Sequence, residues 1–308
     1  MTDGGRIAMD GAEPREMGVT VDAYAKVNFT LEVLGKRPDG YHDLRSVVMP
    51  VSLADEVRVR PAETVSVEMT APEGGVSVPT VASEDNLATR AVRLMQRMTG
   101  RRDGAAVSIL KRIPAGGGLG GGSADAAAVL RGVNALWGTN VPIETLAEWG
   151  AQIGSDVPSL VLGGPVLMEG RGERVSRFCE AGVCGRDLDA VLVNPGVFCS
   201  TPKIFAACTE RLPDRPEILY TMRRAMRDGN VDDVARTLQN DLAEAACRIY
   251  PVIQTACAAL SEAGCAGVSM SGSGSTVFGL VRDEEEAARI ADEMRRRGFW
   301  SAAVQTVR

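Results

Sequence analysis

The sequence contains few aromatic residues, a single histidine and no surplus of positive charge. Aromatic residues make up 4% of the 308 positions, and the formal net charge at pH 7 is −6. Proteins that bind nucleic acid usually carry a basic, aromatic surface, so this composition argues against that class. No apolar run approaches the roughly 20 residues that a membrane-spanning helix needs. We therefore expect neither nucleic acid nor a membrane as a partner.

The cysteines offer no recognisable metal site. They are seven in number, no CxxC pair occurs, and His42 is the only histidine. A structural zinc site needs tighter clusters of ligands, so we expect no metal held by protein side chains alone. We predict reduced thiols that pack as small apolar residues in a cytoplasmic protein. The cysteines are Cys179, Cys184, Cys199, Cys208, Cys247, Cys257 and Cys265.

The length of the chain predicts two domains, because 308 residues exceed what one hydrophobic core usually serves. Residues 1–18 contain four acidic residues and no hydrophobic stretch, which predicts a disordered extension rather than a targeting peptide. Glycines cluster at 163–172, so we place domains at 19–168 and 169–308. Strand-like segments precede the helices in a block, and this order favours an α+β fold over a doubly wound parallel sheet. Apolar spacing predicts helices at 86–98, 123–136, 143–153, 202–211, 216–228, 231–239, 251–263 and 284–297.

A glycine-rich loop is the most informative segment. Six glycines fall within residues 116–122, between a predicted strand and a predicted helix. Glycine permits positive φ and close approach of a ligand, so successive amides can form an anion nest at the helix N-terminus. We predict a cradle for nucleotide phosphates in which Ser123 caps the helix or donates to a phosphate or Mg²⁺. The cradle comprises Pro114, Ala115, Gly116, Gly117, Gly118, Leu119, Gly120, Gly121, Gly122, Ser123 and Ala124.

Other interpretations of the loop fit less well. A flexible linker seldom separates a tight strand from a strong helix. A Walker A loop needs a lysine where Gly122 stands. The dinucleotide pattern GxGxxG matches formally, but a second strand ending in an acidic residue should follow it. Residues 137–142 instead form a turn that leads into another helix. A kinase loop of the form PxxxGLGGSS is the remaining candidate.

The loop resembles the second signature of the GHMP kinase family, named for galactokinase, homoserine kinase, mevalonate kinase and phosphomevalonate kinase. Two further signatures occur in the same order, at Ala25–Asn28 and Ser269–Thr276, and the resemblance extends from about residue 19 to the end. It implies a two-domain α+β fold, with an ATP-binding N-terminal domain like domain 2 of ribosomal protein S5 and a ferredoxin-like C-terminal domain. It also implies that ATP is used as its Mg²⁺ complex.

Finer motifs narrow the substrate. The segments Gly35–His42, Ile153–Pro158, Gly170–Glu173 and Asn240–Leu242 resemble the members that phosphorylate the 2-hydroxyl of CDP-linked methylerythritol in the non-mevalonate isoprenoid pathway. A GHMP kinase for a mevalonate-like or homoserine-like alcohol stays open as an alternative, although RPDGYH is not expected there. A non-catalytic nucleotide-binding relative also stays open, although it would be expected to lack a catalytic lysine or aspartate.

The resemblance assigns catalysis to Lys26 and Asp156. Lys26 and Asn28 are two apart on a predicted strand and so share a face, and the resemblance places Asn28 at the methylerythritol part of the substrate. A nearby ammonium lowers the pKa of a carboxyl group and makes it a weaker base. Because a loose phosphoryl-transfer transition state needs little early proton removal, we expect Asp156 to orient the hydroxyl and take its proton late, while Lys26 stabilises charge.

The remaining assignments also follow from the resemblance. Tyr41, His42, Thr201 and Phe205 would line the pocket for the cytidine end. Gly272 and Gly274 would let the second glycine loop lie close to the substrate or to the phosphate loop. Asn86 and Lys111 would lie near the adenine and ribose of ATP. The alternatives without a role in ATP binding are a helix N-cap for Asn86 and an exposed strand position for Lys111. The sequence does not give the oligomeric state.

Overall fold

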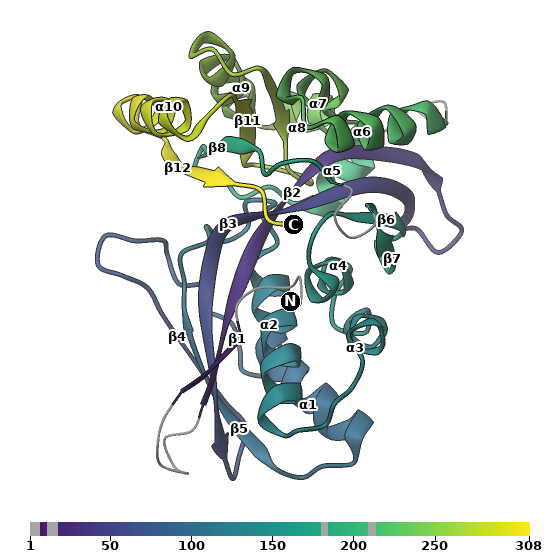
Figure 1. Ribbon diagram of the computed structural model, residues 1–308, viewed down its shortest axis with the longest axis vertical. Coiled ribbons are helices and arrows are strands. Elements are labelled where there is room, and N and C mark those ends of the chain that lie inside the picture. The colour runs from purple at the N-terminus through teal and green to yellow at the C-terminus, as the bar shows by residue number, and fades with distance from the viewer. Residues whose placement is uncertain (1–6, 11–17, 180–183, 209–213) are drawn as a thin grey trace. The chain divides into compact units, whose positions relative to one another are not determined.

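Two very long strands dominate the N-terminal third of the chain: β2 (Gly18–Lys36) and β3 (His42–Ala62). They belong to a computed structural model that describes residues 7–10, 18–179, 184–208 and 214–308 (Figure 1). These residues form two compact units, and both strands contribute to each. Unit 1 is built within Met1–Ala25, Leu53–Ala115 and Gly120–Gly163, and unit 2 is built within Lys26–Ser52, Gly116–Leu119 and Gly164–Arg308. The boundary at 168–169 stays a prediction.

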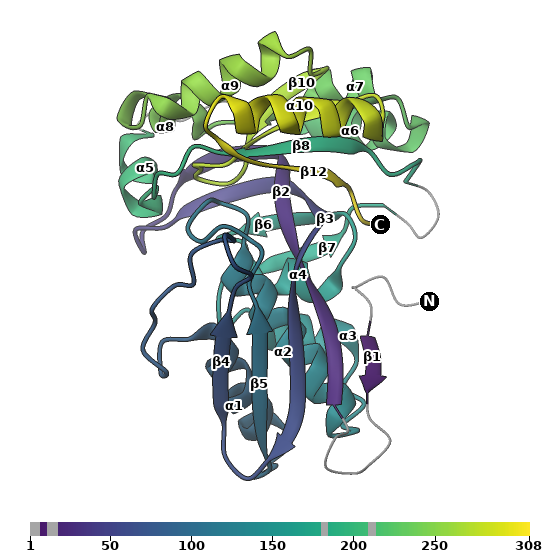
Figure 2. The ribbon, with the colours of Figure 1, turned by 90° about the vertical axis from the view of Figure 1, so that its left-hand side faces the viewer.

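In unit 1, helices cover one face of a mixed sheet. The strand order is β1-β2-β3-β5-β4, in which β1 is the short strand Ile7–Asp10. Strand β5 (Gly104–Leu110) pairs antiparallel with β3 and parallel with β4 (Ser66–Thr70). Helices α1 (Leu87–Thr99) and α2 (Gly121–Leu136) lie behind β4 and β5 in Figure 2. Gly132 allows α2 to approach the sheet, because a Cβ there would lie 2.9 Å from Val59 Cγ2. Two short helices follow, α3 (Ile143–Gly150) and α4 (Val157–Leu162).

The N-terminal extension contains an element that the sequence did not predict. Ile7–Asp10 forms strand β1, which pairs antiparallel with β2 from Ile7↔Val21 to Asp10↔Gly18. The prediction of a disordered extension is therefore wrong for these four residues, which pair with β2. The rest of the predicted extension, apart from Gly18, lies outside the described residues.

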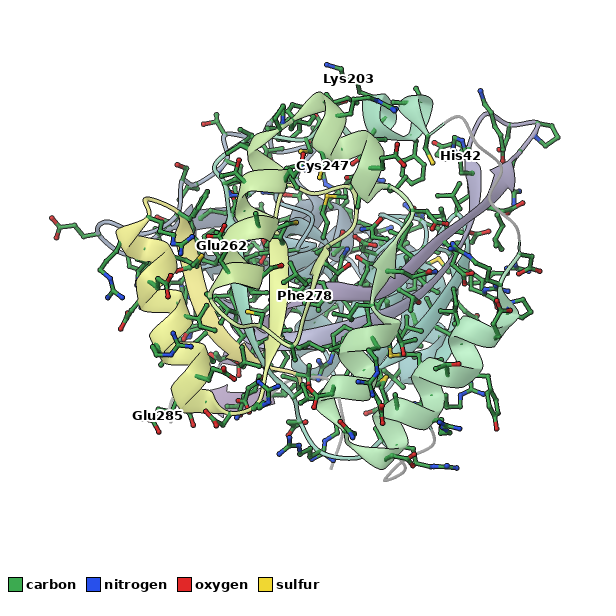
Figure 3. All side chains as sticks on the ribbon, turned by 90° about the horizontal axis from the view of Figure 1, so that it is seen from above. His42, Lys203, Cys247, Glu262, Phe278 and Glu285 are labelled. Atoms are coloured by element: carbon green, nitrogen blue, oxygen red, sulfur yellow. A yellow bond between two sulfur atoms is a disulfide. The ribbon has the colours of Figure 1, made fainter. Side chains whose placement is uncertain are left out.

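In unit 2, an antiparallel sheet has the strand order β10-β11-β8-β12. In chain order these are the second, third, first and fourth strands, which is the ferredoxin-like arrangement with helices in the two crossovers. Figure 3 marks β11 by Phe278 and the start of α10 by Glu285. Phe278 stacks on Phe29 of β2 at a centroid distance of 5.9 Å. The strands are β8 (Asp189–Asn194), β10 (Gly267–Met270), β11 (Val277–Val281) and β12 (Trp300–Gln305).

Smaller elements complete unit 2. Strand β6 (Val166–Gly170) pairs with both β3 and β7 (Arg174–Arg177), and β9 (Gln239–Asn240) pairs parallel with β2. Together, the blocks of strands and helices in the two units confirm the predicted α+β class. The helices of unit 2 are α5 (Thr201–Ala207), α6 (Pro216–Asp228), α7 (Val231–Thr237), α8 (Ala243–Ile249), α9 (Val252–Glu262) and α10 (Glu284–Arg296).

Helix α6 has the predicted bounds, whereas α4 and α8 were missed. Both are too short to show a full amphipathic repeat. Pro158 in the first turn of α4 resembles a turn signal, although proline is tolerated at that position. The predicted helix at 202–211 corresponds to α5, and its last part lies outside the described residues. The described residues contain no helix long and apolar enough to cross a bilayer.

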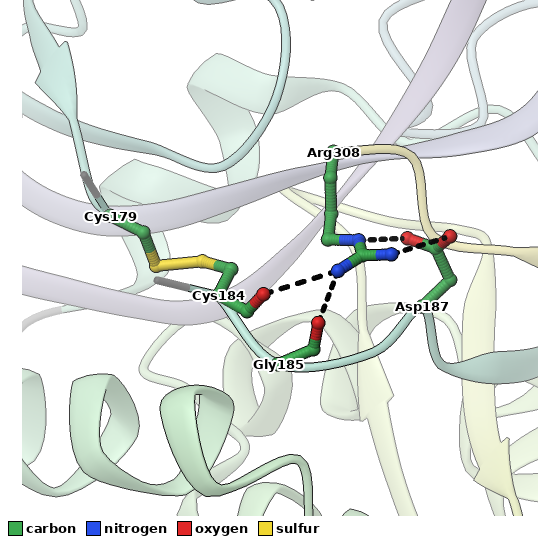
Figure 4. Close-up of a disulfide and its surroundings, with 5 residues drawn as sticks. All are labelled: Cys179, Cys184, Gly185, Asp187 and Arg308. Atoms are coloured by element: carbon green, nitrogen blue, oxygen red, sulfur yellow. Dashed lines mark hydrogen bonds and ion pairs between the residues drawn. A yellow bond between two sulfur atoms is a disulfide. The ribbon is translucent and has the colours of Figure 1, made fainter. Parts of the chain in front are cut away.

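The cysteines do not all follow the prediction of reduced thiols. Cys179 and Cys184 form a disulfide with Cα atoms 5.8 Å apart (Figure 4). Beside it, the Arg308 guanidinium donates to the Cys184 carbonyl at 3.2 Å and to Asp187 at 2.7 Å. The prediction is wrong for this pair, because the backbone places the two Cα atoms at a separation that a disulfide can span, which the lack of a CxxC pattern did not indicate. The other five cysteines, all within the described residues, form no disulfide.

Candidate active site

The predicted catalytic lysine lies buried on β2. Lys26 is 3% exposed, and its Nζ donates a hydrogen bond of 2.8 Å to Asn28 Oδ1 on the same strand face. Asn28 in turn donates through Nδ2 to Ser46 Oγ of β3 at 2.8 Å. This lysine is therefore not a solvated edge charge, and a neutral amide fixes its ammonium group.

Three hydrogen bonds attach the middle of the first glycine loop to the rest of unit 2. The Thr276 N–H donates to the Gly117 carbonyl at 3.0 Å, and Ser271 Oγ donates to the Gly118 carbonyl at 2.9 Å. The Lys26 N–H donates to the Leu119 carbonyl at 3.0 Å. The second loop and the strand that carries Lys26 are thus joined to the first loop at its backbone carbonyls, through two backbone N–H groups and one serine hydroxyl.

Glycine is required where these segments approach each other. Gly118 has φ +78°, and a Cβ there would lie 2.2 Å from the Ser271 carbonyl oxygen. Gly272 has φ +57°, and a Cβ there would lie 3.3 Å from Lys26 Nζ. Both positions combine a left-handed backbone with close contact, so a side chain would displace one loop from the other.

A side chain missed as a site residue holds the second glycine loop in place. Asn240 Nδ2 donates to the carbonyls of Met270 at 2.7 Å and Gly272 at 2.8 Å. Its Oδ1 accepts the Leu242 N–H at 2.9 Å. Asn240 lies in the segment Asn240–Leu242, whose resemblance to the kinase family was the available signal. Gly274 lies in the same loop with φ +83°, where a Cβ would lie 2.8 Å from Met270 Sδ.

The residues predicted for the cytidine end lie in unit 2. His42 stacks on Phe205 with ring centroids 5.1 Å apart, and the Arg171 guanidinium lies 4.9 Å from the centroid of the Tyr41 ring (Figure 3 marks His42). Burial, aided by the charge of Lys36, lowers the pKa of His42, so its imidazole is neutral at pH 7.

Thr201 connects the predicted cytidine group with the second glycine loop. Its Oγ1 lies 2.7 Å from Ser273 Oγ, a hydroxyl pair in which either atom can donate. Ser273 stands between Gly272 and Gly274 in the sequence. The structure therefore brings Thr201 to the second loop, while His42 and Phe205 pair with each other.

Unit 1 contains a buried cluster of charges beside the first glycine loop. Lys111 is 3% exposed and forms ion pairs with Asp55 and, at 2.6 Å, with Asp125 Oδ2. The alternative of an exposed strand position for Lys111 is therefore wrong. Burial lowers the pKa of Lys111, but the charges of Asp125 and Asp55 outweigh it and leave the pKa raised. Burial also raises the pKa of Asp125 to about 7, against the opposing charge of Lys111.

Helix α2 begins with glycine rather than with serine. Its N-cap is Gly120 with φ +72°, and no side chain caps it. The prediction that Ser123 caps this helix is therefore wrong, because Ser123 is its third residue. The Ser123 hydroxyl instead lies beside Gly154, where a Cβ would be 3.8 Å from Oγ.

Asn86 does cap α1, because its side chain accepts the Ala88 N–H at 2.9 Å. The contact of Asn86 with ATP stays a prediction.

Asp156 occupies the N-cap position of α4 in unit 1. Its carbonyl accepts the Ser159 hydroxyl at 2.8 Å, which stabilises the first turn of this short helix. The pairing of Asp156 with Lys26 of unit 2 stays a prediction, as does a direct contact between Lys111 and ATP.

Asp55 was also missed as a residue of the candidate site. It lies 56 positions from Lys111 in the sequence, and no motif around Asp55 indicates that the two side chains pair.

Comparisons with known proteins agree on one family. The model of the GHMP kinases N terminal domain matches residues 86–164, and that of the GHMP kinases C terminal matches residues 222–299. A 4-diphosphocytidyl-2-C-methyl-D-erythritol kinase of Geobacter sp. (strain M21) is 40% identical over 92% of this chain and 98% of its own length. One from Pelotomaculum thermopropionicum is 40% identical over 91% and 95%.

Solved structures show the same likeness. A crystal structure of 4-(cytidine 5'-diphospho)-2C-methyl-D-erythritol kinase covers 94% of this chain and 99% of its own, with a TM-score of 0.77 and 32% identity. Homoserine kinase from Cytophaga hutchinsonii covers 98% of each chain with a TM-score of 0.71 at 20% identity. The second likeness concerns the fold alone, so it does not favour a homoserine-like substrate.

Proposed function

The chain belongs to the GHMP kinase family, and on that premise we propose that it phosphorylates the 2-hydroxyl of 4-diphosphocytidyl-2-C-methyl-D-erythritol with ATP. The reaction is a step of the non-mevalonate pathway to isoprenoid precursors. The observation that carries the proposal is the similarity to kinases of that name at 40% identity over almost the whole chain. A mevalonate-like or homoserine-like substrate is not favoured, because the structural likeness to homoserine kinase is at 20% identity.

In the proposed reaction the protein forms no covalent bond with the substrates and acts by positioning them and stabilising charge. ATP supplies an electrophilic γ-phosphoryl group, and the 2-hydroxyl oxygen forms the new P–O bond while the bond to ADP breaks. Asp156 orients the hydroxyl and receives its proton late in the step. Lys26 stabilises the charge on the transferring group, and its bond to Asn28 aims the ammonium.

The nucleoside end of the substrate is assigned to His42, Phe205 and Tyr41. A neutral imidazole offers one N–H donor and one acceptor nitrogen, which suits the edge of a cytosine. The stacking of His42 on Phe205 supports this assignment, because it fixes the orientation of the imidazole. The exposed Tyr41 ring offers a face for stacking on the base.

Mg²⁺ is assigned to the nucleotide rather than to a protein cage. The described residues contain no group of three or more histidine, cysteine or acidic side chains that could hold a metal. The phosphates of ATP would supply most ligands, with Ser123 as the protein ligand. We place the enzyme in the cytoplasm, with the CDP-linked alcohol and ATP as its partners.

A substrate comparison tests the proposal. The purified chain would be incubated with ATP, Mg²⁺ and one of three alcohols: CDP-methylerythritol, mevalonate or homoserine. We expect phosphorylation of the first alone, with Asp156→Asn as an inactive control that still binds ATP. Turnover of only mevalonate or homoserine would replace the substrate. Binding of ATP without turnover of any alcohol would indicate a non-catalytic relative.

A further inference from the structure

We propose that Asp55 and Asp125 are positioning residues for ATP. Together with Lys111 they form a clamp that fixes the strand before the first glycine loop to the helix after it. The three residues are called the Lys111 clamp below. The proposal rests on the proposed function, since it takes ATP to be the ligand of that loop.

The clamp joins three segments of unit 1. Asp55 lies on β3, Lys111 directly follows β5, and Asp125 is the fifth residue of α2. Lys111 Nζ reaches both carboxylates, and Asp55 Oδ1 also accepts the backbone N–H groups of Arg112 and, at 2.9 Å, of Ile113. Asp55 therefore fixes the side chain and the backbone of the segment that leads into Pro114.

The strand end and the helix start are in contact at the clamp. A Cβ on Gly121, the first residue of α2, would lie 3.1 Å from Ile113 Cγ2 and 3.7 Å from Lys111 Nζ. Six glycines fall within residues 116–122, four of them in the loop before α2, and glycine loses more conformational freedom on ordering than any other residue. Fixing both ends reduces the freedom that a bound phosphate must remove. It also fixes the direction of the N–H groups at the helix start.

The charges of the clamp are not arranged for stability alone. One ammonium serves two carboxylates, and Asp55, Lys111 and Asp125 are 0%, 3% and 4% exposed. Among the residues that the structure describes, the buried Asp125 Oδ1 has no hydrogen-bond partner. An unpartnered buried oxygen is unfavourable, and well-packed apolar side chains often stabilise a core as well as a buried ion cluster does. Apolar contacts have no preferred direction, so they would not fix the distance and orientation between β5 and α2 as hydrogen-bonded ion pairs do.

Calorimetric titration of the full chain with MgATP and with CDP-methylerythritol tests the positioning role. Asp125→Ala breaks one arm of the clamp, and we expect the Kd for ATP to rise about tenfold while the Kd for the alcohol changes less than about twofold. Asp125→Asn keeps the shape and an oxygen for Lys111, so we expect it to recover most of the ATP affinity. Asp125→Leu leaves no unpaired oxygen and gives the same comparison if the alanine variant does not fold.

A stability-matched control separates positioning from folding. Asp283 caps α10 in unit 2 by accepting the Glu286 N–H at 2.8 Å, so Asp283→Ala lowers stability without touching the clamp. We expect its ATP affinity to equal that of the wild type. A lowered Tm in Asp125→Ala with unchanged ATP affinity would overturn the proposal, as would an equal loss of affinity for both ligands. A wild-type chain that bound no ATP would overturn the proposed function and the clamp together.

Discussion

The two units hold their predicted site residues by different kinds of interaction. In unit 1, three buried charges of the Lys111 clamp fix the ends of the first glycine loop. In unit 2, the Ser271 hydroxyl and the Asn240 amide bind backbone carbonyls of the glycine loops. The arrangement in unit 1 depends on side-chain charge and on pH. The arrangement in unit 2 depends on the absence of side chains at Gly118 and Gly272, so the two should respond to different changes.

The largest effect is expected for Lys26 in unit 2. Lys26→Met removes the ammonium that Asn28 aims and keeps an apolar side chain of similar length. We expect kcat to fall by about 10³-fold, because charge stabilisation of this kind is worth several kcal/mol. Steady-state kinetics with circular dichroism as a folding check would measure it. A fall smaller than about tenfold would remove Lys26 from catalysis.

The next effect tests the close approach of the two loops. Gly118→Ala places a methyl group against the Ser271 carbonyl, and we expect kcat/KM to fall by about 100-fold, as a 1 Å displacement in an active site can cause. Gly138→Ala is the matched control, since Gly138 also has positive φ but has no atom within 4 Å of a Cβ. Equal losses in both variants would mean that backbone strain, not the contact between loops, is what matters.

The pH dependence of stability should distinguish the units. Folding raises the pKa of the Asp125 carboxyl from 3.8 to about 7. The contribution of this group to the free energy of unfolding is therefore most favourable below pH 4 and is lost as pH rises through 7. Between pH 5 and pH 8 this loss would be about 2–3 kcal/mol. Lys111 has a pKa raised above 10.5, so its contribution is constant across this window.

Denaturant unfolding of the wild type and Asp125→Asn across pH 5 to 8 measures the contribution of Asp125 to the free energy of unfolding. We expect the free energy of unfolding of the asparagine variant to decline less with pH than that of the wild type. Ser271→Ala, in unit 2, should follow the wild-type curve at a constant offset. Parallel curves for the wild type and Asp125→Asn would show that the buried carboxyl does not titrate in this range.

The smallest effect concerns the stacked rings of unit 2. Phe205→Leu keeps an apolar side chain but removes the ring that orients His42, a contact worth about 1 kcal/mol. We expect KM for the CDP-linked alcohol to rise about fivefold, with little change in kcat or in KM for ATP. A change in KM for ATP instead would place Phe205 at the wrong end of the substrate pair.

The sequence predicted short-range features of the site better than long-range ones. Lys26 and Asn28 share a strand face because strand periodicity requires it, and the glycines of the first loop mark a close approach by their residue type alone. Asp55 could not be found in this way, because its partner Lys111 is 56 positions away and only the paired strands bring them together.

The same limit applies to the fold. The α+β class follows from the order of strands and helices, whereas β1 and the helices α4 and α8 are too short to carry a periodic signal. The disulfide was missed because spacing alone does not show that Cys179 and Cys184 face each other. Local residue chemistry is visible in a sequence, and contacts between distant segments are not.

Phosphorus NMR of the reaction products tests the central claim most directly. The chain would be incubated with ATP, Mg²⁺ and CDP-methylerythritol, and the product would be compared with the starting alcohol. The account predicts one new phosphomonoester signal without three-bond coupling to a proton, because a methyl group replaces the hydrogen of the 2-carbon. The diphosphate signals should stay unchanged, and one ADP should form per product. Release of ADP without that signal, or a phosphomonoester coupled to a proton, would contradict it.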